Sequence, residues 1–301
     1  MNPFLKWAGG KRWLIPRIRN NIPTFSTYYE PFLGSGALFF LLEPKAAILA
    51  DMNPDLINCY RQVKNNCPSI IKILKRIKGD KDTYYLIREK FNTERDRIKK
   101  AAYFIYINKT CWNGLYRVNK SGKFNVPIGR SSSENSRVFD ADQLLKASRL
   151  LKRAKLKCCD FEEAVKDSRR RTDFIYFDPP YITTHINNGF AEYNSVLFQH
   201  SDELRLAKLA EKLARRGAKV MVSNAAHPLI KQQYDGVFFK TEIERPSLIA
   251  GDPNKRSRFT ELLVTSFPIN LESQGSAGNR PKHSSARESQ YRPSFNPKCK
   301  R

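Results

Sequence analysis

The stretch Asp173–Thr183, DFIYFDPPYIT, begins as an apolar run of strand length and then changes abruptly to a carboxylate, two prolines and an aromatic ring. An uninterrupted apolar run is typical of a strand in a parallel sheet that is covered on both faces. Pro179 and Pro180 end such a strand because they supply no backbone N–H to a neighbour. The stretch therefore predicts an α/β sheet with a rigid exit that presents Asp178 and Tyr181 at its edge.

Similar apolar runs recur along the chain and alternate with helical patterns such as Asp202–Gly217, DELRLAKLAEKLARRG. Continuous strands separated by helices predict an α/β fold with a doubly wound, Rossmann-like sheet. The last two strands are expected to be antiparallel neighbours. We expect strands at residues 27–30, 46–50, 155–159, 174–177, 220–223, 237–244 and 261–267.

Between the second and third of these strands, residues 54–154 become helical and basic. This length far exceeds what a crossover needs, so the segment is expected to be an inserted helical subdomain for substrate recognition. Residues 1–53 and 155–270 would then form the main, discontinuous domain. Residues 271–301 are rich in Ser, Pro, Asn and basic side chains, which predicts a disordered basic tail.

The composition points to a globular protein with a polyanionic partner. The 301 residues are 41% hydrophobic, and 54 Lys and Arg against 29 Asp and Glu give a net charge of +25, for which solubility alone is the alternative explanation. No apolar run approaches the roughly 20 residues of a membrane span, and no signal peptide is evident, so we expect no membrane role and a cytoplasmic or nucleoid location. The four His and six Cys show no zinc spacing, so no metal is expected.

Ligands of open α/β sheets bind beyond the carboxyl ends of the strands. Gly34, Ser35 and Gly36 follow the first strand, where glycines let backbone approach a ligand, although a plain turn would look the same. No Lys-Ser/Thr pair follows, which disfavours a triphosphate loop. Asp51 ends the second strand, where an acid can accept hydrogen bonds from ribose hydroxyls. It is expected to be free for a ligand because Asn53 suits the cap of the next helix.

Two more carboxylates end strands. Asp160 has Phe161 beside it. It either contacts an adenine ring in the ligand whose ribose would bind Asp51, or it caps the following helix. The exit from Asp178 to Tyr181 offers acceptors without donors, which suits a substrate amino group, and an aromatic ring that can stack on a planar one. A rigid turn alone would explain the prolines but not the acid and the ring together.

Five motifs occur in a characteristic order: FLKWAGGK (4–11), EPFLGSGA (30–37), LADMNPDL (49–56), CWNGLYRVNKSGKFNVPIGR (111–130) and DPPY (178–181). By these motifs the chain resembles the Dam-type DNA adenine methyltransferases over about residues 4 to 267. The resemblance implies a methyltransferase fold and an enzyme that transfers a methyl group from S-adenosylmethionine to the amino group of an adenine flipped out of double-stranded DNA.

The resemblance also implies roles for individual residues. Asp178 and the Pro179 carbonyl would accept hydrogen bonds from the adenine amino group, and Tyr181 would stack on the base. Lys11 would lie near the carboxylate end of the cofactor. The implied catalytic residues are Asp178, Pro179, Pro180 and Tyr181, and the implied cofactor-binding residues are Trp7, Lys11, Gly34, Ser35, Gly36, Asp51, Asp160, Phe161 and Asp178.

The motif at 111–130 is expected to be a loop and hairpin that reads the bases of GATC, with a solvated basic hairpin as the alternative. Trp112 stands where the family commonly has a smaller aromatic residue, and Ser131 where it often has an aromatic one. Arg117 would donate two hydrogen bonds to a guanine. The implied DNA-recognition residues are Lys6, Trp112, Asn113, Leu115, Arg117, Pro127 and Arg130.

Residues 183–198, with Tyr193, are expected to form a flap over the flipped base, and residues 244–259 to contact phosphates through Arg245, Lys255, Arg256 and Arg258. One active site for each chain is sufficient, so a monomer is expected. A restriction endonuclease acting separately is left open as a partner. The alternatives in function are an RNA or cytosine amino methyltransferase, an adenine methyltransferase for another sequence, and a catalytically silent DNA-binding regulator.

Overall fold

The computed structural model describes residues 1–129, 138–168, 171–181, 198–246 and 258–269. Residues Met1–Asn270 form one compact unit. Several predictions lie outside the described residues: the basic tail, the role of Arg130, the neighbouring Ser131, almost all of the flap with Tyr193, and the side-chain contacts of Arg245, Lys255, Arg256 and Arg258. Within the described part, no helix is both long and apolar enough to cross a membrane.

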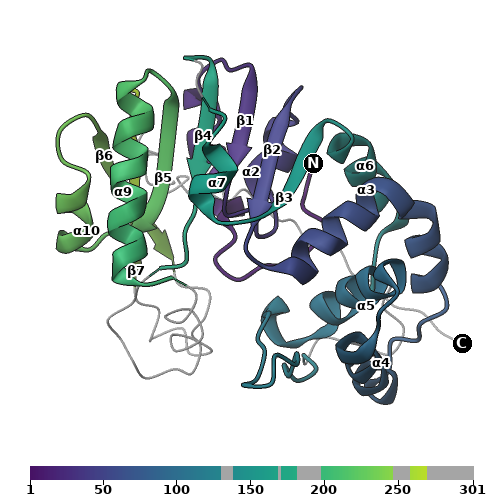
Figure 1. Ribbon diagram of the computed structural model, residues 1–301. Helices are drawn as coiled ribbons and strands as arrows, with labels where there is room; N and C mark the ends of the chain where they lie inside the picture. Colours follow the sequence, from purple (N-terminus) through teal and green to yellow (C-terminus); the bar gives the residue numbers. More distant parts are fainter. Residues whose placement is uncertain (130–137, 169–170, 182–197, 247–257, 270–301) are drawn as a thin grey trace, which may run out of the picture. The chain divides into compact units, whose positions relative to one another are not determined.

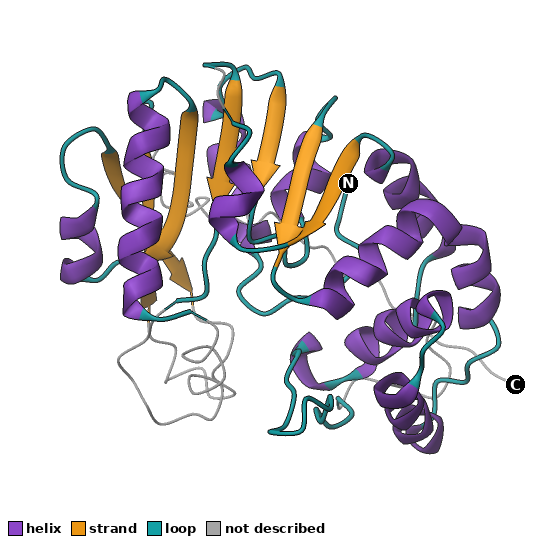
Figure 2. Cartoon of the chain, in the orientation of Figure 1, coloured by secondary structure: helices purple, strands orange, loops and turns teal. Residues whose placement is uncertain are grey.

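Within the described residues, seven strands form one sheet in the order β3-β2-β1-β4-β5-β7-β6 (Figure 2). The first five are parallel neighbours, and β7 pairs antiparallel with both β5 and β6. Each expected strand is present, and the prediction that the last two are antiparallel neighbours is confirmed. The strands are β1 (Thr27–Glu30), β2 (Ala47–Asp51), β3 (Ala154–Cys158), β4 (Asp173–Phe177), β5 (Lys219–Ala225), β6 (Phe239–Pro246) and β7 (Arg258–Thr265).

Helices α7 (Phe161–Val165) and α9 (His200–Arg215) lie on one face of the sheet (Figure 1). The strand β4 is buried at every position and sends alternate side chains to opposite faces. Ile175 and Phe177 join the apolar core under these two helices. Phe174 packs on the other face against the ring of Tyr28. This two-sided burial is the reason for the continuous apolar run in the sequence.

The helical part of the chain begins directly after β2, where Asn53 caps α3 (Pro54–Leu74) by accepting hydrogen bonds from the backbone of Asp55 and Leu56. Asp80 and Asp96 cap the next two helices in the same way. These helices are α4 (Lys81–Thr93) and α5 (Arg97–Thr110), and α6 (Ala141–Leu151) returns the chain to β3. The shorter helices are η1 (Lys11–Trp13), α1 (Ile15–Ile18), η2 (Arg19–Asn21), α2 (Ala37–Leu42), η3 (Trp112–Gly114) and α10 (Pro228–Gln233).

The strand β3 forms one edge of the sheet, and side chains from α3 bond two of its outer backbone oxygens. The Arg61 guanidinium donates to the Leu156 carbonyl over 3.1 Å, and the Lys64 ammonium donates to the Ala154 carbonyl over 2.7 Å. Two carbonyls that would otherwise face outward are therefore bonded within the chain.

Candidate active site

Asp178 follows the end of β4, as predicted, and its carboxylate is held by two neighbours. The Ser223 hydroxyl donates to Asp178 Oδ1 over 2.7 Å, and the Lys11 ammonium lies 3.0 Å from the same oxygen. The Tyr176 hydroxyl lies 2.9 Å from Ser223 Oγ. The Asp178 side chain keeps 20% of its surface exposed, so a ligand can reach a carboxylate that is already oriented.

Lys11 is buried, with 4% of its surface exposed, and its ammonium group lies among several active-site groups. Besides Asp178, it lies 3.6 Å from a Glu261 carboxylate oxygen, and it donates to the Gly9 carbonyl over 3.1 Å. The ammonium also lies 4.4 Å from the centre of the Tyr181 ring. In the structure Lys11 contacts the group at Asp178, and its implied position near the carboxylate end of the cofactor stays a prediction.

Glu261 and Ser223 belong to the site but were missed by the sequence analysis. The Tyr181 hydroxyl donates to Glu261 Oε2 over 3.0 Å. Glu261 is 5% exposed and lies near the start of β7, opposite Ala225 at the end of β5. Because β7 is antiparallel to its neighbour, its beginning lies at the carboxyl edge of the parallel strands. A carboxylate at the head of the apolar run ELLVTSF was the available signal.

Burial dominates the electrostatics of this group. It raises the pKa of the Asp178 carboxyl, the Lys11 ammonium and the Ser223 hydroxyl oppose that change, and the Glu261 charge adds to it. Burial also raises the pKa of Glu30 well above its usual range, and the charges of Asp178 and Asp51 act in the same direction. Glu30, at the end of β1, is a further buried acid near the site to which the sequence analysis gave no role.

The glycine turn after β1 lies against the Trp7 side chain. Gly34 and Gly36 adopt φ angles of +45° and +64°, and a Cβ on Gly34 would lie 2.8 Å from Trp7 Cδ1. Ser35, between them, is buried. Only glycine permits this close approach of indole and backbone without displacement. Trp7 and the turn Gly34–Gly36 therefore pack closely against each other, and we call this pair of segments the cradle.

Asp51 is not free of structural contacts, which corrects the expectation. Its Oδ2 accepts from the Gly34 amide over 3.1 Å, and its Oδ1 accepts from the Asn53 amide over 2.9 Å. Burial raises the pKa of Asp51, and these two amides partly oppose the change. The carboxylate therefore fixes the glycine turn and has one lone pair left on each oxygen for a ligand.

Asp160 caps α7, which was the alternative to a ligand contact. Its Oδ1 accepts from the Glu162 amide over 2.9 Å and lies 3.1 Å from the Arg205 guanidinium. The Phe161 side chain is 4% exposed, packs on Phe32 with ring centres 5.5 Å apart, and has Arg205 over its ring. These contacts give both residues a place in the fold, and their implied contact with the cofactor stays a prediction.

The segment from Cys111 to Gly129 forms the expected loop and hairpin. Cys111 pairs with Ile128, and Val118 pairs with Phe124. The Arg117 Nε donates to Asn125 Oδ1 across the hairpin over 2.9 Å, which holds the guanidinium in place. Of the other expected recognition residues, Trp112, Asn113 and Pro127 are exposed and Leu115 is partly buried.

Asn108 on α5 ties the N-terminal segment to this hairpin. Its side chain accepts from the Lys6 amide over 2.9 Å and donates to the Lys6 carbonyl over 2.7 Å and the Gly114 carbonyl over 3.3 Å. The Lys6 ammonium donates to the Lys109 carbonyl over 3.0 Å. The sequence analysis missed Asn108, because a single amide inside a helical pattern carries no signal of its role.

A second link joins the glycine turn to the hairpin. The Trp7 indole stacks on the Tyr116 ring, with ring centres 6.1 Å apart and planes inclined by 20°. The Tyr116 hydroxyl donates to Asp55 over 2.9 Å, and Asp55 also pairs with Lys100. The indole that covers Gly34 therefore also contacts the hairpin.

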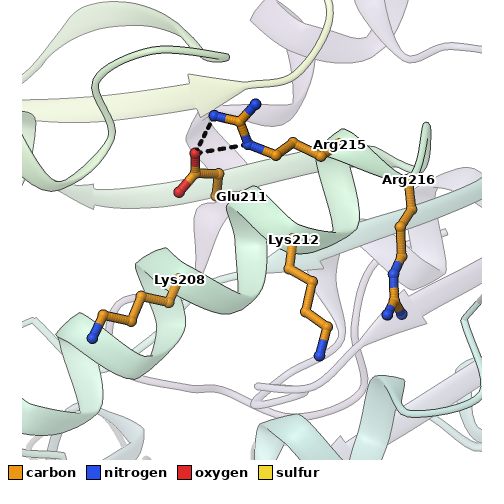
Figure 3. Close-up of a pocket in the computed structure, with 5 residues that line it drawn as sticks. All are labelled: Lys208, Glu211, Lys212, Arg215 and Arg216. Carbon is orange, nitrogen blue, oxygen red and sulfur yellow. Dashed lines mark hydrogen bonds and ion pairs between the residues drawn. The ribbon is translucent and has the colours of Figure 1, made fainter.

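A separate hollow lies on α9 and has a different character. Figure 3 shows Lys208, Lys212 and Arg216 on one side of the helix, while Arg215 turns the other way to pair with Glu211. The residues that line this hollow include no aromatic ring and no glycine turn, so it does not resemble the site around Asp178. Among the described residues, no group of three or more His, Cys, Asp or Glu side chains is arranged to hold a metal ion.

The sheet order, the glycine turn after β1 and the acid-Pro-Pro-Tyr exit after β4 define a Rossmann-like methyltransferase. Residues 7–247 match the family described as D12 class N6 adenine-specific DNA methyltransferase, and the chain belongs to this family. It is therefore an enzyme that methylates adenine in DNA. The family implies S-adenosylmethionine as the methyl donor.

Curated relatives match most of the chain. The Type II methyltransferase M.MjaIII of Methanocaldococcus jannaschii is 38% identical over 290 residues, which cover 89% of this chain and 99% of the relative. The DNA adenine methylase of Serratia marcescens is 34% identical and covers 87% and 97% of the two chains. That of Vibrio cholerae is 34% identical, with 90% and 98% covered.

Proposed function

We propose that the protein methylates the exocyclic amino group of an adenine that is flipped out of duplex DNA at GATC sites. The observation that supports this most strongly is the environment of Asp178. Its carboxylate is anchored through one oxygen by Ser223 and Lys11 but is still partly exposed, at the edge of the sheet where ligands of such folds bind. A base has to leave the stacked duplex to reach a carboxylate in such a position.

The chain's own groups would orient the adenine. The amino nitrogen is a poor nucleophile because its lone pair is delocalised into the ring. Asp178 Oδ2 and the Pro179 carbonyl would accept its two N–H bonds, which localises the lone pair and aims it at the donor. Lys11 covers one face of the Tyr181 ring, so the base would stack on the opposite face.

The cradle of Trp7 and the turn Gly34–Gly36 fits S-adenosylmethionine. The positive φ angles expose backbone to a ligand, and Asp51 keeps lone pairs for ribose hydroxyls while it holds the turn. Bound S-adenosylmethionine supplies a sulfonium methyl group, which is the electrophile. We propose Trp7, Gly34, Ser35, Gly36 and Asp51 as its contacts.

The hairpin would read the target bases. Arg117, held at Nε by Asn125, keeps its two terminal amino groups for a guanine in the major groove. Lys6 would contact a flanking base, with Asn113, Leu115 and Pro127 supporting readout. DNA adenine methylases and Type II methyltransferases both occur among the relatives, so a target other than GATC is the second candidate. We propose a monomer as the active species, with any restriction endonuclease acting separately.

Transfer of labelled methyl from S-adenosylmethionine to four duplexes tests the proposal. These contain GATC, the permutation GTAC, no adenine, or GATC already methylated on both strands. Label in unmodified GATC alone supports the reaction, the base and the target together. Equal label in GTAC would refute the specificity assigned to the hairpin. Asp178→Asn should abolish transfer and keep DNA binding, and an active variant would remove Asp178 from the mechanism.

A further inference from the structure

A second carboxylate, Glu261, lies beside Lys11 and Tyr181, and the mechanism above gives it no part. We propose that Glu261 is a positioning residue that keeps the group formed by Lys11, Asp178 and Glu261 negatively charged, so that this group favours the positive charge that develops on the adenine amino nitrogen. The inference depends on the proposed role of Asp178 as the acceptor.

Two of the contacts that Glu261 makes lie at the proposed site. Its Oε2 accepts from the Tyr181 hydroxyl over 3.0 Å, which fixes the ring proposed to stack on the base. The same oxygen lies 3.6 Å from the Lys11 ammonium, which lies 3.0 Å from Asp178. Glu261 thus contacts the stacking ring and the cation that neutralises the acceptor, without needing to contact the base.

The charges explain why one carboxylate would be insufficient. As the methyl group transfers, the amino nitrogen gains positive charge, and a nearby negative charge stabilises it. Asp178 paired with Lys11 alone is a neutral pair, so much of its attraction for a new cation is cancelled. With Glu261 the three groups carry one net negative charge. Lys11 still orients Asp178 while the group as a whole remains attractive to a cation.

Burial of the Glu261 carboxylate costs free energy of folding, and this cost calls for a functional reason. In β7 Glu261 directly precedes Leu262, Leu263 and Val264, which are fully buried apolar side chains. A buried ion pair is seldom more stabilising than an apolar replacement of similar volume. A carboxylate at this position is therefore better explained by the charge that the site requires than by the stability of the sheet.

The pH dependence of catalysis separates this role from a structural one. Among the described residues, the charged and titratable groups that interact with Asp178 are Lys11 from η1, Tyr28 and Glu30 from β1, Tyr176 from β4, Tyr181 from the strand exit and Glu261 from β7, with the Ser223 hydroxyl from β5. Glu261 is among those that raise the pKa of Asp178. Removal of its charge should therefore move the acid limb of the kcat profile to lower pH.

Glu261→Gln tests the inference with single-turnover kinetics across pH on a GATC duplex. We expect the plateau rate to fall about tenfold, which corresponds to a rise of about 1.4 kcal/mol in the barrier, with little change in DNA affinity. The acid midpoint should shift to lower pH. Glu261→Asp, which keeps the charge, should hold the midpoint at the wild-type position.

Glu203→Gln is the matched control. Glu203 is also buried and accepts a tyrosine hydroxyl, from Tyr234 over 3.2 Å, but it lies on α9 and bonds to Asn224. We expect this variant to keep the wild-type midpoint and plateau. If Glu261→Gln also kept both, or lost activity only in proportion to lost folded protein, the inference would be overturned. A fully active Asp178→Asn would instead overturn the proposed function itself, so the two failures are distinguishable.

Discussion

Replacement of Gly114 by alanine tests the contact between the N-terminal segment and the hairpin. Gly114 has a φ of +64°, and an added Cβ would lie 2.4 Å from the Lys6 Cβ. Real Cβ atoms do not approach so closely, and a Cβ is not the movable end of a side chain. The Lys6 backbone is in turn held by two hydrogen bonds to Asn108. Alanine at position 114 therefore fits only if the Lys6 backbone moves, although Asn108 bonds both its amide and its carbonyl.

Gly122, at the tip of the same hairpin, supplies the control. Its φ is +71°, and no heavy atom of the described residues lies within 4 Å of an added Cβ. Both alanine variants incur the strain of a left-handed backbone, about 1–2 kcal/mol. Only Gly114→Ala adds overpacking, which typically costs about 1–3 kcal/mol. We expect a loss of about 2–5 kcal/mol at Gly114 against about 1–2 kcal/mol at Gly122.

Urea unfolding gives the two free energies, and methyl transfer to a GATC duplex gives the functional effect. Gly114→Ala should also raise KM for DNA, because the displaced Lys6 is a proposed base contact, whereas Gly122→Ala should leave KM near the wild-type value. Equal losses of stability in the two variants would refute the steric argument, since the left-handed strain is common to both.

Three further outcomes are expected. Asn108→Ala should lower the free energy of unfolding by about 2–3 kcal/mol, since two hydrogen bonds to Lys6 are lost; a urea titration showing no loss would contradict this. Burial raises the pKa of Glu203, so its contribution to stability is present at low pH and lost as pH rises through the folded-state pKa. Glu203→Gln should therefore gain stability over wild type as pH rises, and unfolding measured at several pH values checks the sign. Burial raises the pKa of Cys111 to about 11, whereas Cys158 is exposed, so iodoacetamide at neutral pH should label Cys158 before Cys111, as peptide mass spectrometry would show.

The fold was largely predictable because local and global preferences agree. Strands buried on both faces leave continuous apolar runs such as the one before Asp178, and the helices between them carry clear caps such as Asn53, Asp80 and Asp96. The position of β7 between β5 and β6 was not predicted, because pairing between strands distant in sequence depends on the whole sheet.

The site was predictable where one short segment carries the chemistry. Asp178 and Tyr181 stand in such a segment, and so does the glycine turn. The partners that orient them do not: Glu261 lies far along the chain and meets Tyr181 only through the fold. For Asp51 and Asp160 the sequence was ambiguous, because an acid after a strand can bind either a ligand or a backbone amide. The structure shows that Asp51 accepts from the Gly34 amide and Asp160 from the Glu162 amide.

The capped edge of the sheet has a consequence for how chains of this protein meet one another. An open edge strand offers a template to which a second copy can add its own strand. Along β3, the bonds from Arg61 and Lys64 occupy two of the acceptors that such pairing would need. Loss of both side chains would leave these carbonyls open to pairing with a strand of another chain. The effect would therefore be seen as aggregation of concentrated protein before it was seen in catalysis.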